Sequence, residues 1–191
     1  MVIINLMIIT LFVCSIVLLS GVKIMFKSKY TQIIMFLFVT YNPLLNLIYG
    51  YKLGYTGISS IIIFIILFLS IFIWGYRKNK YTYSIHNVKQ NDVINIIEMY
   101  LETKNIKYEI IEKDIYLPEF YKTIFVNGLI ETNIDYRDIK DMNFHDELVA
   151  IVRVGIKETK RSKISIEGMF YLVFVGILYW IRTEFLVGFI K

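Results

Sequence analysis

The sequence has few of the residues on which catalytic sites and covalent crosslinks depend. Cys14 is its only cysteine, so no disulfide can form within the chain. The two histidines, His86 and His145, stand outside the spacings that bind metals, such as HExxH. The acidic run at 135–141 (DYRDIKD) has basic residues between its aspartates and no central glycine, which fits a solvated turn better than a calcium loop. We therefore expect no enzyme activity, no catalytic residue, no cofactor and no metal site.

Ionisable side chains are also missing from long parts of the chain. Four apolar segments lie at about residues 3–20, 33–49, 58–75 and 164–181, and Glu167, near the inner end of the fourth, is the only acidic or basic residue in them. At about 1.5 Å per residue, a helix of such a length crosses most of a hydrocarbon core of roughly 30 Å. The sequence thus predicts an α-helical membrane protein with four transmembrane helices.

The tail beyond the fourth segment is less apolar. Arg182 and Glu184 follow Ile181 directly, and continuing the span to Ile190 would place both charges in lipid. We expect the helix to end near Ile181 and the tail to lie at the membrane–water interface.

Positive charge is concentrated beside the apolar segments. The chain has a formal net charge of +5, yet residues 81–156 contain eight basic and thirteen acidic residues, which argues against a nucleic-acid partner. The basic clusters are Lys23, Lys27 and Lys29; Arg77, Lys78 and Lys80; and Lys157, Lys160, Arg161 and Lys163. Because basic residues favour the inner side, we expect the N-terminus outside and the central region in the cytoplasm. The second and third clusters are expected to contact anionic lipid.

The central region has the pattern of a folded domain. Residues 1–76 would form three transmembrane helices, 77–163 an inserted cytoplasmic α+β domain with a mostly antiparallel sheet, and 164–191 the fourth helix and a short tail. Within the domain, strand patterns at 81–88 and 107–112 flank a helical stripe at 91–103.

Two local signals specify the rest of this domain. Asn127-Gly128 between alternating runs predicts a two-residue type I′ turn. Asn143 is expected to cap the last helix, with Leu148, Ile151 and Val152 on its core face.

The second apolar segment carries an unusual polar pair. Asn42 and Asn46 lie one helical turn apart beside Pro43, and carboxamides in lipid require hydrogen-bond partners. We favour hydrogen bonds between helices; the alternative is a polar patch for a substrate or a partner helix.

These features indicate a class of function and no specific activity. The abundance of Ile, Asn, Lys, Tyr and Phe suggests an AT-rich, bacterial genome. We expect a multi-pass cell-membrane protein whose cytoplasmic domain binds a protein or a small ligand, in a regulatory, scaffold or immunity-type role. Its partners are the bilayer and either another protein or a second copy, through the spans or the domain. The alternative is a subunit of a transport complex in which Asn42 and Asn46 line a path.

Overall fold

The computed structural model describes the backbone of residues 2–128, 130–160 and 165–190. Side chains are described for those of these residues that lie between 5 and 183. The chain divides into two compact units. We call residues Lys27–Thr82 the hairpin unit, and Met1–Phe26 together with Tyr83–Lys191 the sheet unit.

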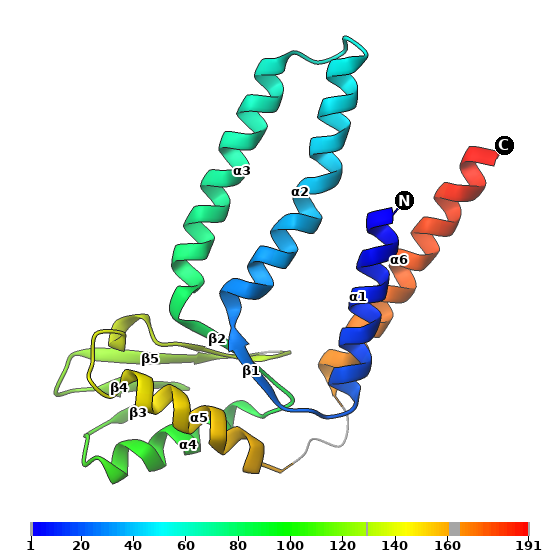
Figure 1. The fold of residues 1–191 in the computed structure, drawn as a ribbon. Helices are drawn as coiled ribbons and strands as arrows, with labels where there is room; N and C mark the ends of the chain where they lie inside the picture. The colour runs from blue at the N-terminus through cyan, green and yellow to red at the C-terminus, as the bar shows by residue number, and fades with distance from the viewer. Residues whose placement is uncertain (1, 129, 161–164, 191) are drawn as a thin grey trace. The chain divides into compact units, whose positions relative to one another are not determined.

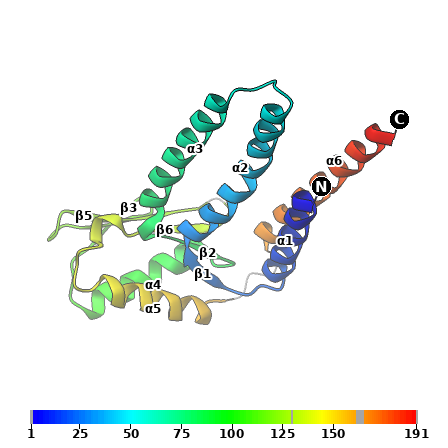
Figure 2. The ribbon, with the colours of Figure 1, turned by 45° about the horizontal axis from the view of Figure 1, so that its top comes forward.

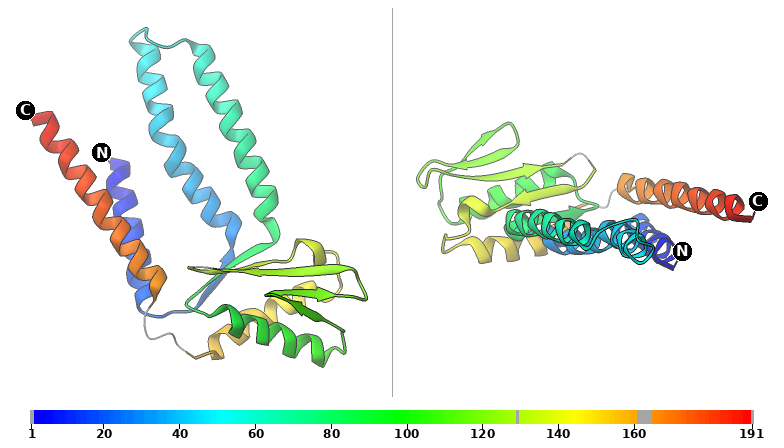
Figure 3. Two further views of the ribbon diagram at one scale, coloured as in Figure 1. Left: turned by 180° about the vertical axis from the view of Figure 1, so that it is seen from behind. Right: turned by 90° about the horizontal axis from the view of Figure 1, so that it is seen from above.

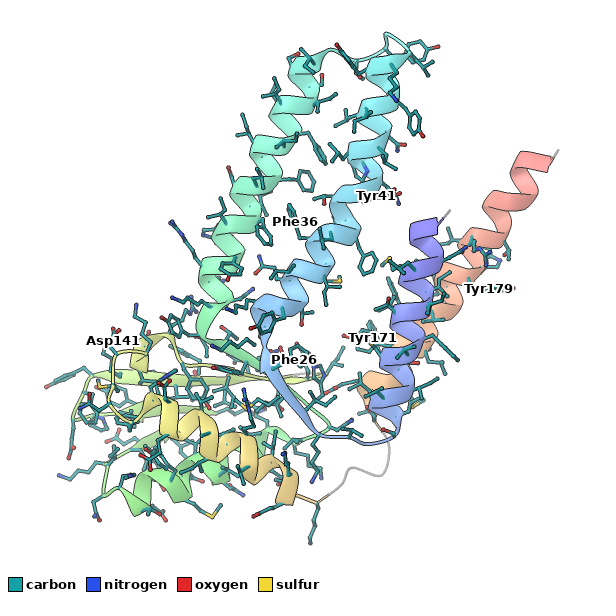
Figure 4. All side chains as sticks on the ribbon, viewed as in Figure 1. Phe26, Phe36, Tyr41, Asp141, Tyr171 and Tyr179 are labelled. Carbon is teal, nitrogen blue, oxygen red and sulfur yellow. The ribbon has the colours of Figure 1, made fainter. Side chains whose placement is uncertain are left out.

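The hairpin unit consists of two long helices, α2 (Ser28–Lys52) and α3 (Ile58–Lys78), followed by a short 3-10 turn, η1 (Asn79–Tyr81). The two helices lie side by side and run in opposite directions (Figure 1). The rings of Phe36 and Phe72 pack between them with centroids 4.4 Å apart, and Figure 4 shows Phe36 on the side of α2 that faces α3. At the end of the hairpin where the two helices are connected, the Thr56 hydroxyl donates to the carbonyl of Leu47 at 3.2 Å.

Three helices are long and apolar enough to cross a membrane: Ser28–Lys52, Ile58–Tyr81 and Ile166–Thr183. The first expected span also forms a helix, α1 (Val2–Leu19), but its part Asn5–Leu19 is shorter than the other three. The antiparallel helix pair that α1 forms with α6 (Ile166–Ile190) belongs to the sheet unit (Figures 1 and 3).

The end of α6 differs from our expectation. The helix does not end near Ile181 but continues to Ile190. Backbone hydrogen bonding within a helix is satisfied on either side of the interface, so the two charges at Arg182 and Glu184 do not stop it.

The sheet unit contains a six-stranded sheet in the order β1-β2-β6-β5-β4-β3. Pairing is antiparallel for β3 with β4, β4 with β5, and β5 with β6. The strands are β1 (Ile24–Lys27), β2 (Thr82–His86), β3 (Glu109–Ile111), β4 (Asp114–Leu117), β5 (Lys122–Asn127) and β6 (Thr132–Asp135).

Two helices, α4 (Gln90–Thr103) and α5 (His145–Glu158), pack side by side on one face of this sheet (Figure 2). The helical stripe predicted at 91–103 is the buried face of α4. The core between helices and sheet is aliphatic, with fully buried side chains that include Ile85, Val93, Ile97, Leu101, Ile124, Ile134, Leu148 and Val152.

One strand comes from outside the range 77–163 that the sequence indicates for the domain. β1 lies in the loop after the first apolar segment, and its Met25 joins the core cluster of the domain. The sheet is therefore built from two distant parts of the chain.

The β5–β6 hairpin exists, but its predicted two-residue turn is wrong. Asn127 pairs with Asn133 and Val126 with Ile134, so the connection is longer than two residues. A two-residue turn at Asn127-Gly128 would set Ile124 opposite Glu131 and place that carboxylate on the buried face. The observed register keeps apolar residues together there, and burial therefore overrides the turn preference.

The start of α5 also differs from our prediction. The residue before the helix is Phe144, and no side chain caps it, so Asn143 is not the cap. The core face consists of Leu148, Val149, Val152 and Ile156, whereas Ile151 is exposed. Ile151 thus lies on the outer face of the helical layer.

Tyr136 yields a stability prediction. Its side chain is fully buried, burial raises its pKa, and its hydroxyl has no hydrogen-bond partner among the residues that the structure describes. A buried hydroxyl without a hydrogen-bond partner lowers the free energy of unfolding by about 1–3 kcal/mol. We expect Tyr136→Phe to stabilise the protein by about 1 kcal/mol or more, measured as a higher thermal midpoint, because the ring contacts with Tyr83 and His145 are kept. A lower midpoint would show that the hydroxyl has a partner.

Candidate functional site

A buried histidine joins the sheet to a helix that is long and apolar enough to span a membrane. His86 ends β2, and its Nδ1 lies 2.7 Å from Oε2 of Glu167 in the first turn of α6. The two side chains are only 5% and 7% exposed. Side chains alternate along a strand, so Ile85 points to one face of β2 while His86 and Ser84 share the other.

A second carboxylate lies on the other side of the imidazole. Oε2 of Glu131 is 3.4 Å from Nε2 of His86, a distance too long for a strong hydrogen bond, so Glu167 is the main partner. Glu131 itself accepts a hydrogen bond from Nδ2 of Asn133 at 3.2 Å. The ring of Phe26 stacks on the imidazole with centroids 5.0 Å apart. We call His86, Glu131 and Glu167 the His86 cluster.

Neighbouring residues fix the ends of α1 and α6 beside this cluster. Asn87, in a left-handed conformation with φ of 61°, donates from Nδ2 to the carbonyls of Leu18 and Val22, each at 2.8 Å. Ser165 caps α6, because its hydroxyl accepts a hydrogen bond from the amide of Gly168 at 3.1 Å. The end of β2 is thus connected to both helices by polar contacts.

This arrangement attaches α6 to the sheet through a buried polar contact between His86 and Glu167. Ionisable side chains in or beside apolar spans are costly to bury and often have a function. The His86 cluster is therefore the candidate link between the domain and α6.

A long groove runs along the outer face of α4 and α5, with a volume of about 1490 Å³. Three of its apolar side chains are exposed: Met99 and Val154, each 59%, and Ile151, 37%. The two helices approach closely beside it, since a Cβ on Gly155 would lie 3.0 Å from Cγ2 of Ile96. Pockets for small ligands measure roughly 300–1,000 Å³, so the groove has room for a segment of another protein.

One end of the groove is closed by a polar contact between the helices. Nζ of Lys104 lies 2.9 Å from Glu147, and the Tyr100 hydroxyl donates to the same carboxylate at 3.1 Å. The lysine lowers the pKa of Glu147, while burial and the nearby carboxylate raise the pKa of Tyr100 to about 12.

This contact predicts a pH dependence. Because the folded state depresses the pKa of Glu147, its contribution to stability is present above the ordinary value of 4.5 and is lost as the pH falls through the folded value. The thermal midpoint should therefore fall more between pH 6 and pH 3 in the parent than in Glu147→Gln. Equal slopes for both proteins would show that the contact does not form in solution.

The polar pair in α2 has no partner in the hairpin unit. Asn42 and Asn46 are both exposed, and neither donates to or accepts from another residue that the structure describes. Thr40, by contrast, is satisfied within the helix, since its hydroxyl donates to the carbonyl of Phe36 at 2.7 Å.

The expected lipid-contacting residues are mainly exposed. Arg77 and Lys78 end α3, and Lys80 lies in η1. Lys157 lies in the last turn of α5 and Lys160 just beyond it, whereas Arg161 and Lys163 fall outside the described residues. Aromatic rings accompany two of them: Nζ of Lys78 lies 5.4 Å from the ring of Trp74, and Nζ of Lys80 lies 5.0 Å from that of Tyr81.

One lysine of the first cluster has a structural role that its sequence position does not indicate. Lys23 donates to the carbonyls of Lys157 and Thr159 at the end of α5. A cation at a helix C-terminus is favourable because the last carbonyls carry partial negative charge.

The remaining acidic and histidine candidates form local contacts. Asp135 pairs with Arg137, and Asp138 and Asp141 are exposed around the short turn η2 (Arg137–Ile139), with Asp141 in the loop that leads to α5 (Figure 4). His145 lies 2.8 Å from its neighbour Asp146. A search of the described residues finds no group of three His, Cys, Asp or Glu side chains that could hold a metal ion.

Comparisons of the chain with protein-family models, with curated proteins and with solved structures give no match. Function is therefore argued from the geometry alone.

Sequence reasoning missed the His86 cluster because its contacts are long-range. His86 and Glu167 are 81 residues apart. The available signal was the single carboxylate in the fourth apolar segment, which required a buried partner.

Proposed function

We propose that this is a non-catalytic bacterial membrane protein that binds a protein partner through its α+β domain, in a regulatory, scaffold or immunity-type role. The groove between α4 and α5 carries this proposal. Its size and its exposed apolar side chains fit an amphipathic helix or an extended apolar segment of another protein. The His86 cluster would transmit occupancy of the domain to α6.

The proposed topology has four spans, α1 in addition to the three longer apolar helices, and places the N-terminus outside and the domain in the cytoplasm. The distribution of basic residues supports this orientation. In a Cys14→Ser background, Tyr55→Cys should react with an impermeant maleimide added outside, and Lys113→Cys should not; both positions are exposed. External labelling at 113 would overturn the arrangement.

The binding proposal is tested by a charge in the groove. Val154→Asp should abolish capture of the partner from native membranes in mild detergent and should fail to complement a deletion strain. Ile110→Asp is the matched control, since it also replaces an exposed aliphatic residue, but on β3, away from the groove. A captured protein that both variants retain would show that the groove is not the binding surface.

A transport subunit is the second candidate, and the exposure of Asn42 and Asn46 on α2 favours it. If the two carboxamides line an aqueous path, Asn42→Cys in the Cys14→Ser background should react with a hydrophilic maleimide at a rate near that of Tyr55→Cys. A reaction at least about a hundred times slower would indicate a dry environment and exclude the path.

A further inference from the structure

We propose that α2 pairs with α2 of a second copy of this chain, through a seam formed by Met35, Val39, Asn42, Asn46 and Tyr49. This inference is independent of partner binding by the domain. It rests on the second face of α2, which α3 leaves uncovered.

The two faces of α2 are distinct. Gln32, Phe36 and Leu47 contact α3 or the loop before it. At about 100° per residue, Asn42 and Asn46 lie about 100° around the helix from that line. Within the hairpin unit the seam is exposed along its length, with Met35 at 49%, Val39 at 56% and Tyr49 at 59%.

The spacing of the seam is that of a helix–helix contact. Its members recur at intervals of four, three, four and three residues, the heptad pattern that keeps one stripe facing a neighbouring helix. The residues facing α3 have a similar spacing, so α2 has two seams, of which the hairpin unit uses one.

The chemistry of the seam selects a second copy as its occupant. Each carboxamide both donates and accepts, so an asparagine can pair with another asparagine. Copies of one protein insert in the same orientation, so two α2 helices run parallel and equal residues meet at equal depth. Asn42 then meets Asn42, and Asn46 meets Asn46, which satisfies all four amides within the apolar part of the span. A different protein would need polar residues at the same two depths.

Disulfide crosslinking in native membranes tests the pairing. In the Cys14→Ser background, Val39→Cys should give a crosslinked product of twice the 22.6 kDa chain on oxidation. Leu37→Cys is the matched control, because Leu37 is 62% exposed at nearly the same depth but lies on the opposite side of α2. Equal crosslinking at both positions, no crosslink at Val39, or a product of another mass would each overturn the proposal.

The role of the carboxamides is tested separately. The double change Asn42→Leu with Asn46→Leu should weaken dimerisation about 3- to 30-fold, measured by energy transfer between labelled copies in phosphatidylcholine vesicles of increasing lipid content. Ser70→Leu is the control, since the Ser70 hydroxyl is already satisfied by the carbonyl of Ile66 within α3. If the double variant dimerised with the same affinity as the parent protein, the proposed asparagine pairing would be wrong.

Discussion

Replacing His86 with alanine is expected to destabilise the protein by about 3–5 kcal/mol, one of the two largest effects that we predict. The change leaves Glu167, whose side chain is 7% exposed, without its partner at 2.7 Å. It also removes the ring that stacks on Phe26. The thermal midpoint of the purified protein in detergent measures the loss.

A double-variant cycle separates the pair from general packing. Glu167→Gln keeps the shape of the side chain and an acceptor oxygen, so we expect it to cost less than His86→Ala. The coupling free energy between the two changes should be about 1.5–3 kcal/mol, the range for a hydrogen bond to a charged group. Additive effects would mean that the carboxylate charge of Glu167 contributes nothing to its contact with His86.

The elements that the sequence predicts well are those whose signals are local. The stripe on α4 depends on residues within one helix, and three apolar segments become helices long enough to span a membrane. Register and caps depend on tertiary burial, which is why the Asn127-Gly128 turn and the Asn143 cap were wrong.

The features that no local signal indicated are the ones that join distant parts of the chain. β1 is only four residues long and lies in a basic loop, so neither length nor alternation marks it as a strand. Lys23 in that same loop contacts the end of α5, 134 residues away. In a sheet built from two distant segments, such contacts are fixed only when the whole unit folds.

The second large effect that we predict concerns Gly168, a glycine at the start of α6. A Cβ on Gly168 would lie 2.8 Å from Cγ of Leu19 and 2.9 Å from its backbone nitrogen. Flexible side chains can move aside at small cost, but backbone cannot, so any larger residue must separate α1 from α6. Close packing between small residues is the main source of helix association in lipid, where the hydrophobic effect no longer drives it.

We therefore expect Gly168→Val to destabilise the protein by about 3 kcal/mol, at the upper end for overpacking, and to lower the thermal midpoint in detergent. Gly176→Val is the matched control, because it lies on the same helix with nothing within 4 Å of its Cβ position. The loss should reach the His86 cluster, since Gly168 is the residue after Glu167, and labelling of a cysteine introduced at Ser84 should become faster. If Gly168→Val and Gly176→Val behaved alike, the close contact between α1 and α6 at Leu19 would not exist in the purified protein.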